Sequence, residues 1–234
     1  MRIYKKLVVA TLIIATVICS IIPVGAIEVI TPPAGLGTIH TYTVWDRINW
    51  GWGCKDLINF TKERNALGNS EGIVTYGGYF AGALTSTFGK VGDMLLVVSE
   101  GNIVYPVIIA DTKSQGDAGC TKWGHHYGKC IVEFEILSAY RKSLYGTSGG
   151  YISELLAKPI VKVINLGSVY QSTYYFNNPK QAAIDQGLEG AYLLTSPYGG
   201  ITITDFKGVF CNLGFKEFKN QNPVWKAALI KTII

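Results

Sequence analysis

Asp111 stands where an apolar stretch of sequence ends, a position that can turn a carboxyl group into a general acid. Residues 108–110 are Ile-Ile-Ala, and a polar segment follows Asp111. Apolar neighbours partly desolvate a carboxylate and raise its pKa, which suits the donation of a proton to a leaving group. An aspartate at the end of a strand is, however, more often the first residue of a turn, where its side chain caps the backbone. The sequence alone leaves both interpretations of Asp111 open.

A loop with two adjacent histidines, His125 and His126, lies between Cys120 and Cys130. Two histidines and two cysteines suggest a metal site, but adjacent residues point in different directions and the spacing fits no standard zinc pattern. Asp117, His125 and Cys130 are the groups that could still converge on zinc. We expect instead a disulfide-closed loop with one functional histidine, and neither a metal nor a cofactor.

Cys54 is a second candidate for catalysis because it lies at the start of an expected helix, where the helix dipole lowers the pKa of a thiol. This arrangement resembles the CHAP-type cysteine peptidases of cell walls, which place the cysteine at a helix start and a histidine on a later strand. His125 would then be the base. If the chain is secreted, a disulfide with Cys211 or a buried thiol is favoured instead.

These residues are positioned by elements that the hydrophobic pattern predicts. Residues 100–102 (Glu-Gly-Asn) are typical of the turn between two strands of a hairpin. The polar, glycine-rich residues 111–128 predict an exposed loop, and along residues 129–136 Glu133 and Glu135 fall on the same face of a strand. The expected strands are 72–76, 93–99, 103–110, 129–136, 160–166 and, with weaker patterns, 170–175 and 201–204. The expected helices are 54–65, 149–157, 179–186 and 223–229.

The composition is that of a folded protein of about one domain. The chain has 234 residues, of which 48% are hydrophobic and 16% are charged. These values exclude an intrinsically disordered chain, which is highly charged and poor in apolar residues. No tract repeats, so collagen-like, coiled-coil and low-complexity classes are excluded as well. The length suits one domain, or one domain with a smaller appendage.

The first 26 residues have the features of a secretory signal peptide. Three basic residues precede a mostly apolar run over 7–22, and residues 23–26 (Pro-Val-Gly-Ala) end in a small-x-small cleavage pattern. The run is shorter than the roughly 20 residues that a membrane span needs, so an uncleaved anchor is the less favoured alternative. Cleavage would remove three positive charges and no negative one, which lowers the net charge from +5 to +2. A near-neutral mature chain has no electrostatic footprint for nucleic acid.

Cleavage would also leave an even number of cysteines, enough for two disulfides outside the cell. These cysteines are Cys54, Cys120, Cys130 and Cys211. Their pairing stays open, and free thiols are the alternative for a source that lives without oxygen.

Several motifs between residues 36 and 136 resemble a double-psi β-barrel module found in Gram-positive phage tail lysins and in secreted relatives. The region is also similar to the 3D domain of lytic transglycosylases and, more remotely, to the rare-lipoprotein and expansin barrels. In the 3D domain the catalytic acid is a strand-end aspartate followed by threonine, in an Ala-x-Asp-Thr-Gly pattern. Ala110-Asp111-Thr112 resembles this pattern with one residue fewer between alanine and aspartate. Lys113 stands where that family has glycine. The matching segments are 36–42, 87–93, 108–115, 117–120, 123–125, 128 and 132–134.

The resemblance implies a mainly β (α+β) fold: a six-stranded double-psi β-barrel with a few short helices and a poorly defined C-terminal extension. The expected organisation is a signal peptide at 1–26, a linker at 27–37, a barrel-like domain at 38–166 and an extension of unknown role at 167–234.

The resemblance also implies a lytic transglycosylase that works with a single aspartate. Asp111 would protonate the glycosidic oxygen between N-acetylmuramic acid and N-acetylglucosamine, and would then accept a proton from the muramic 6-hydroxyl. That hydroxyl attacks the anomeric carbon and closes an anhydro ring. His125 is the second expected catalytic residue. The expected substrate-binding residues are Lys113, Trp123, Glu133 and Asp93.

The expected partner is the glycan strand of peptidoglycan, with no nucleic acid and no stable membrane association after cleavage of the signal. The expected state is a monomer, secreted or cell-wall associated, in a Gram-positive-type bacterium. Two alternatives remain: a non-catalytic module that binds cell-wall carbohydrate, and a cysteine peptidase or amidase that uses Cys54 and His125. Replacing Asp111 would leave the first unaffected, and thiol alkylation would inactivate the second.

Overall fold

A computed structural model describes most of the chain between residues 27 and 213. The described residues are 27–45, 53–70, 73–137, 157–195, 201–204 and 210–213. The predicted signal peptide, nearly all of the helix expected at 149–157 and the helix expected at 223–229 lie outside these ranges.

The described chain is mostly strand, with two short α-helices and one 3-10 turn. The helices are α2 (Cys54–Glu63), α5 (Pro179–Asp185) and η2 (His126–Gly128). The strands are β1 (Glu28–Ile30), β2 (Thr41–Val44), β3 (Leu67–Ser70), β4 (Ile73–Tyr76), β5 (Tyr79–Leu84), β6 (Asp93–Ser99), β7 (Ile103–Thr112), β8 (Glu133–Ile136), β9 (Ile160–Ser168), β10 (Tyr192–Thr195), β11 (Ile201–Thr204) and β12 (Phe210–Leu213). No helix in these ranges is both long enough and apolar enough to cross a membrane.

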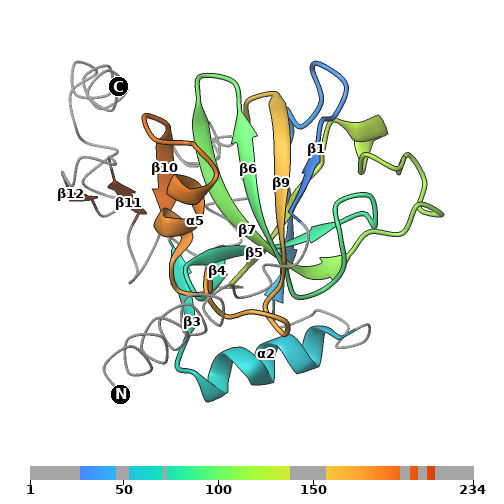
Figure 1. The fold of residues 1–234 in the computed structure, drawn as a ribbon. Helices are drawn as coiled ribbons and strands as arrows, with labels where there is room; N and C mark the ends of the chain where they lie inside the picture. Colours follow the sequence, from blue (N-terminus) through green and yellow to red (C-terminus); the bar gives the residue numbers. More distant parts are fainter. Residues whose placement is uncertain are drawn as a thin grey trace, which may run out of the picture.

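The strands form one mixed sheet, which Figure 1 shows with β6, β7 and β9 at its centre. The strand order is β1-β9-β6-β7-β5-β4-β8-β2, and β10 pairs with β7 to one side. Two pairings inside the main order, β5 with β7 and β2 with β8, are parallel. The mainly β class is therefore confirmed. Among the described strands the sheet is open, and the six-stranded double-psi barrel stays a prediction.

The predicted hairpin is present. Strand β6 has the expected bounds. It pairs antiparallel with β7, from Ser99 opposite Ile103 next to the turn to Met94 opposite Ile108. Gly101 and Asn102 have positive φ angles in the turn between them, a conformation that glycine and asparagine adopt most readily. Strand β7 runs to Thr112, two residues further than expected. The strand expected at 170–175 is wrong, because those residues form a turn, irregular backbone and a bend.

The sheet reaches into both segments expected to lie outside the domain. Strand β1, within the expected linker, pairs antiparallel with β9. Strand β10, within the expected C-terminal extension, pairs parallel with β7 and buries Leu193 and Leu194. Helix α5 begins at Pro179, as the proline predicted.

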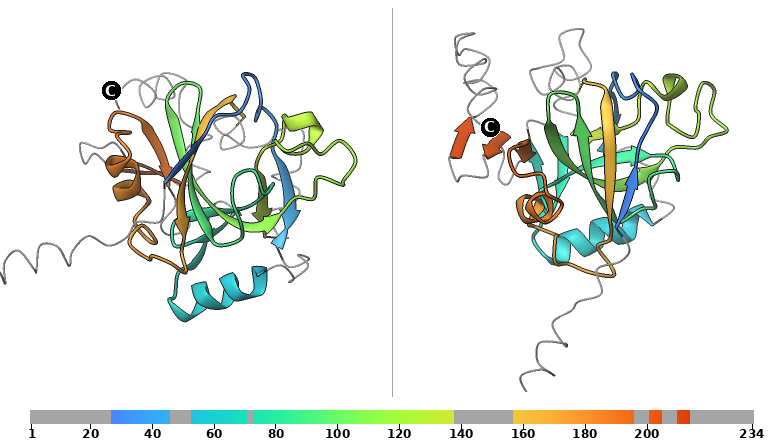
Figure 2. Two further views of the ribbon diagram at one scale, coloured as in Figure 1. Left: turned by 45° about the vertical axis from the view of Figure 1, so that its right-hand side comes forward. Right: turned by 45° about the horizontal axis from the view of Figure 1, so that its top comes forward.

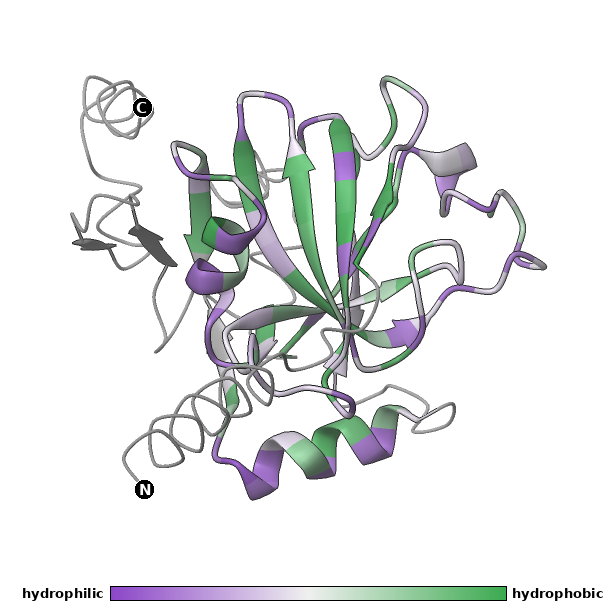
Figure 3. Ribbon diagram, in the orientation of Figure 1, coloured by the Kyte–Doolittle hydropathy of each residue, from purple (hydrophilic) through white to green (hydrophobic). Residues whose placement is uncertain are grey.

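The apolar side chains gather in two clusters, one on each face of the sheet. Along β7, Val107 and Ile109 belong to the first cluster, and Ile108 and Ala110 belong to the second. This alternation follows from the two-residue period of a strand. Figure 3 shows the central strands as mostly hydrophobic, as expected for a sheet buried on both faces.

Helix α2 covers one end of the second cluster. Leu57 and Ile58 are buried there, and the exposed side of the helix carries charged residues. Gly53 is the residue before the helix, and its φ of 86° is left-handed. Figure 2 shows, from two further directions, that α2 lies across the lower end of the sheet. The first residue of this helix, Cys54, therefore meets the end of β7.

Candidate active site

Asp111 lies near the end of β7, next to a β-bulge. On the neighbouring strand β5, Gly82 pairs with Ile109 and Ala83 pairs with Asp111, so Ala110 is the extra residue. Strict alternation would place Asp111 on the same face as Ile109, away from α2. A bulge re-aims the side chain that follows it, and Asp111 here meets Cys54 at the start of α2.

The carboxyl group of Asp111 is half-buried and has two close partners. Its Oδ1 accepts the backbone N–H of Thr112 at 2.8 Å and the thiol of Cys54 at 3.6 Å. Burial raises the pKa of Asp111, the two hydrogen bonds oppose this, and the charge of Glu133 adds to the rise. Asp111 does not start a turn, because β7 continues through Thr112 and the N–H of Lys113 bonds to the carbonyl of Leu84. The partial burial of Asp111 is the feature expected of a general acid.

Cys54 is buried and protonated at neutral pH. Burial and the nearby carboxylates, Asp111 first, raise the pKa of its thiol to about 12. These effects override the helix dipole, which acts in the opposite direction. Such a thiol is a poor nucleophile, so the environment of Cys54 argues against a cysteine peptidase.

Two glutamates of β8 complete a cluster of carboxylates. Glu133 pairs in register with Ala83, the same residue that faces Asp111. Glu135 is 2% exposed and accepts a hydrogen bond from the Tyr76 hydroxyl at 3.3 Å. Burial, followed by the charges of Asp111 and Glu133, raises the pKa of Glu135 to about 8. Glu135 is therefore an uncharged, proton-carrying acid over much of the physiological range.

Tyr76 links Glu135 to the rest of the sheet. Its hydroxyl accepts the Trp45 indole N–H at 2.8 Å and donates to Glu135. Sequence reasoning missed Glu135 and Tyr76 as parts of the site. The alternation along β8 could have indicated Glu135, because it places this residue on the same face as Glu133. Tyr76 is 59 positions from Glu135 in the sequence, and only the fold brings the two together.

His125 lies between two acidic side chains. Its Nε2 is 3.5 Å from Oδ2 of Asp117, and its Nδ1 is 3.5 Å from Oε2 of Glu133. The Thr43 hydroxyl also donates to Glu133. The structure thus brings together Asp111, Glu133 and His125, three of the residues predicted from the sequence.

The side chain of Lys113 is buried, so the expectation of an exposed loop is wrong at this position. The residue is 6% exposed, and its Nζ donates to the carbonyl oxygen of Cys130 at 3.0 Å and lies 3.3 Å from the Cys130 sulfur. These contacts hold the loop that follows β7 against the segment that precedes β8. The predicted role of Lys113 in substrate binding has no support in this geometry.

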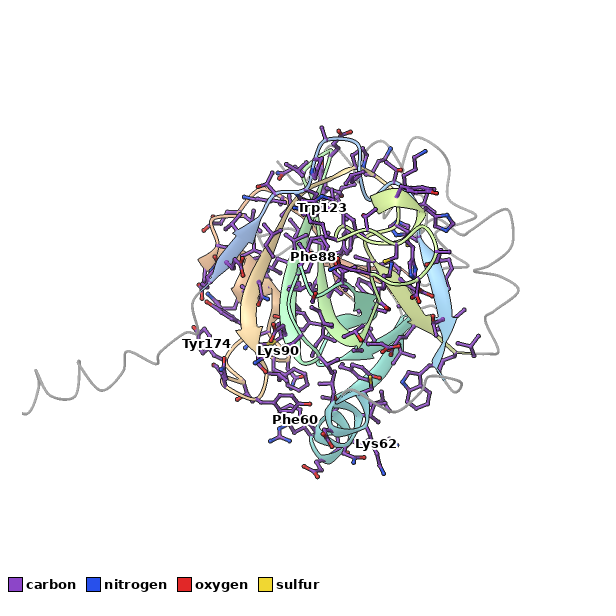
Figure 4. All side chains as sticks on the ribbon, turned by 90° about the vertical axis from the view of Figure 1, so that its right-hand side faces the viewer. Phe60, Lys62, Phe88, Lys90, Trp123 and Tyr174 are labelled. Carbon is purple, nitrogen blue, oxygen red and sulfur yellow. The ribbon has the colours of Figure 1, made fainter. Side chains whose placement is uncertain are left out.

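Asp93 and Trp123 also have structural contacts. Asp93 is 6% exposed and accepts hydrogen bonds from the backbone of Lys90 and from the Asn165 side chain. Trp123 packs against Phe88, with 6.0 Å between ring centroids. Figure 4 shows these two rings together, apart from Phe60 on α2. Neither contact brings Asp93 or Trp123 to Asp111.

Three of the cysteines, Cys54, Cys120 and Cys130, are free thiols. No disulfide joins Cys120 to Cys130, contrary to the expected closed loop. The described residues also contain no group of three or more histidine, cysteine, aspartate or glutamate side chains placed to hold a metal ion. What the arrangement offers is proton chemistry among carboxyl groups.

Comparisons with known proteins add no further constraint. No model of a protein family, no curated protein and no solved structure matches this chain. Functional conclusions therefore rest on the site itself.

Proposed function

We propose that this protein cleaves the glycan strands of peptidoglycan in the manner of a lytic transglycosylase, with Asp111 as the general acid. The observation that carries the proposal is the position of Asp111: half-buried at the end of β7, with a raised pKa, beside further carboxyl groups. A raised pKa lets a carboxylic acid hold its proton to higher pH, which favours the protonation of a glycosidic oxygen.

A single carboxyl group, that of Asp111, can carry out both proton transfers of this reaction. The proton of Asp111 passes to the glycosidic oxygen as the bond from that oxygen to the anomeric carbon breaks. The resulting carboxylate takes the proton of the muramic 6-hydroxyl as its oxygen bonds to the anomeric carbon. Asp111 is protonated again at the end, and no water is consumed. The thiol of Cys54 and the N–H of Thr112 both donate to the carboxylate formed midway.

The proposal includes a double-psi barrel within residues 38–166. The two parallel pairings, β5 with β7 and β2 with β8, support it, because parallel neighbours require the chain to cross over rather than turn back. The predicted signal peptide and the small net charge of the remaining chain support action outside the cell on an uncharged glycan backbone. A monomer suffices, since the carboxyl cluster comes from one chain.

The test is mass spectrometry of purified peptidoglycan after incubation with the purified protein. The Asp111→Asn variant preserves the shape of the side chain and removes its acid. Glu63→Gln, an exposed charge on α2, is the matched control. We expect anhydromuropeptides from the wild type and the control, and a loss of about 100-fold or more in the Asp111 variant.

Three other outcomes contradict the proposal. Freed stem peptides would indicate a peptidase or amidase. Equal cleavage by the Asp111 variant would remove Asp111 from the mechanism. Retention of the protein on intact peptidoglycan, with no product, would establish a non-catalytic carbohydrate-binding module.

A further inference from the structure

Asp111 and Glu133 flank the same residue. Ala83 of β5 pairs with Asp111 on one side and with Glu133 on the other. Residues in register on neighbouring strands project from the same face of a sheet. The two carboxyl groups therefore stand on one face, with the methyl group of Ala83 between them.

The spacing of strands sets the distance between these two residues. Adjacent strands lie 4.7–4.9 Å apart, so residues two strands apart are separated by roughly 9.5 Å at the backbone. Glycosidases that hydrolyse with inversion hold their two carboxyl groups about 6.5–9.5 Å apart, which leaves room for a water molecule beside the sugar. The charge of Glu133 raises the pKa of Asp111, so the two carboxyl groups lie close enough to interact.

The surroundings of the two carboxyl groups differ. Burial raises the pKa of Asp111. Glu133 is contacted by the Thr43 hydroxyl, which donates to it, and by the ring of His125 at 3.5 Å. Its side chain is 17% exposed, so solvent reaches it. Asp117 on the far side of His125, 3.5 Å from Nε2, helps to hold that ring against Glu133.

We propose that Glu133 is a second catalytic residue, a general base that gives the site a hydrolytic activity beside the anhydro-forming one. This inference rests on the proposed function. In the hydrolytic step, Asp111 gives its proton to the glycosidic oxygen, and the bond to the anomeric carbon breaks. A water oxygen bonds to that carbon from the opposite face, and its proton passes to the carboxylate of Glu133. Proton exchange with solvent restores both groups.

The experiment measures both kinds of product from the same peptidoglycan digest in water enriched in heavy oxygen. Hydrolysis places the heavy oxygen in new reducing ends, whereas anhydro ends take up none. The proteins compared are the wild type, Glu133→Gln, Asp111→Asn and Glu63→Gln. Thermal unfolding of each variant verifies that it is folded, and Glu133→Asp tests whether a shorter carboxylate rescues the activity.

We expect the wild type to form labelled reducing ends together with anhydro ends. Glu133→Gln should lower the labelled product about 100-fold or more, and should change the anhydro product far less. Asp111→Asn should remove both. Early reducing ends should carry the inverted anomeric configuration.

The failures of the two proposals are distinguishable. If the wild type forms anhydro ends and no labelled reducing ends, the role of Glu133 is wrong and the proposed function stands. Labelled ends that persist in a folded Glu133→Gln protein would also overturn the inference. An intact wall after incubation with the wild type would overturn both.

Discussion

The thiol of Cys54 donates a hydrogen bond to the carboxyl group of Asp111 across 3.6 Å. The contact joins the first residue of α2 to the end of β7, 57 positions away. It changes what each group can do. Asp111 raises the pKa of the thiol, and the thiol lowers the pKa of Asp111 against the larger effect of burial. Cys54, which its place at a helix start suggested as a nucleophile, is thus a hydrogen-bond donor to the carboxyl group that we propose as the acid.

Alkylation of Cys54 should be slow in the native protein. Its pKa of about 12 and its burial leave almost no accessible thiolate near pH 8. We expect iodoacetamide to label Cys54 only after denaturation, as judged by peptide mass spectrometry, with Cys120 as the internal reference because it is partly exposed. Rapid labelling of native Cys54 with loss of activity would favour the cysteine peptidase.

Replacing Cys54 by alanine should move the pH dependence of glycan cleavage upward. The thiol donates to the Asp111 carboxylate, so its removal disfavours the charged form and raises the pKa of Asp111. A general acid works while protonated, so activity falls as pH rises through this pKa. We expect the alkaline limb of kcat/KM to shift up by about one pH unit, from a hydrogen bond of about 1.5 kcal/mol.

Cys54→Ser is the matched control for this shift, because its hydroxyl keeps a donor at the same place. Its alkaline limb should stay at or below that of the wild type. An alkaline limb that moves equally in the alanine and serine variants would show that packing, and not the hydrogen bond, is responsible.

Glu135 should make the protein less stable as pH rises from about 4.5 to about 8. Folding raises the pKa of this carboxyl group from 4.5 to about 8, so within that range the unfolded chain releases a proton that the native state holds. The stabilising difference is complete below pH 4.5 and is lost as pH rises to 8. Within this window the free energy of unfolding should fall by about 1.4 kcal/mol for each pH unit.

Glu135→Gln removes this titration and keeps an acceptor for the Tyr76 hydroxyl. Urea unfolding of both proteins from pH 4 to 9 measures the effect. The free energy of unfolding of the wild type should fall relative to that of the variant as pH rises, and the difference should level off above pH 8. A difference that is independent of pH would mean that Glu135 is ionised in the native state.

The local elements could be predicted from the sequence, and the arrangement of the site could not. The apolar run of β6, the turn after it and the start of α2 at Cys54 are encoded by neighbouring residues. The face on which Asp111 lies depends on the bulge at Ala110, which exists only because β5 pairs with β7. A strict two-residue period places Asp111 on the wrong face.

Burial of polar groups escaped prediction for a similar reason. Lys113 follows a strand in a glycine-rich segment, which is typical of an exposed loop, yet its ammonium group reaches the carbonyl of Cys130. The parallel pairing of β10 with β7 brings residues 192 and 103 together, a separation that no local pattern reports. Long-range strand pairing therefore determines which residues meet in the site, whereas local propensity determines the strands and helices that carry them.

Gly124, next to His125, should tolerate no side chain. Its φ is +126°, and a Cβ atom would collide with the carbonyl oxygen of Cys130. Gly124 also exchanges two backbone hydrogen bonds with Thr121, so the loop cannot move away without losing them. We expect Gly124→Ala to lower the free energy of unfolding by about 2–4 kcal/mol and to reduce the hydrolytic product, because His125 would leave Glu133.

Gly35→Ala separates backbone strain from collision. Gly35 has a φ of +81° with nothing within 4 Å of an added Cβ, so only the conformational cost of about 1 kcal/mol applies there. Urea unfolding and product analysis of the two variants check both expectations. Equal, small losses of stability would show that the loop around His125 yields to the added methyl group, and that its backbone geometry does not hold His125 against Glu133.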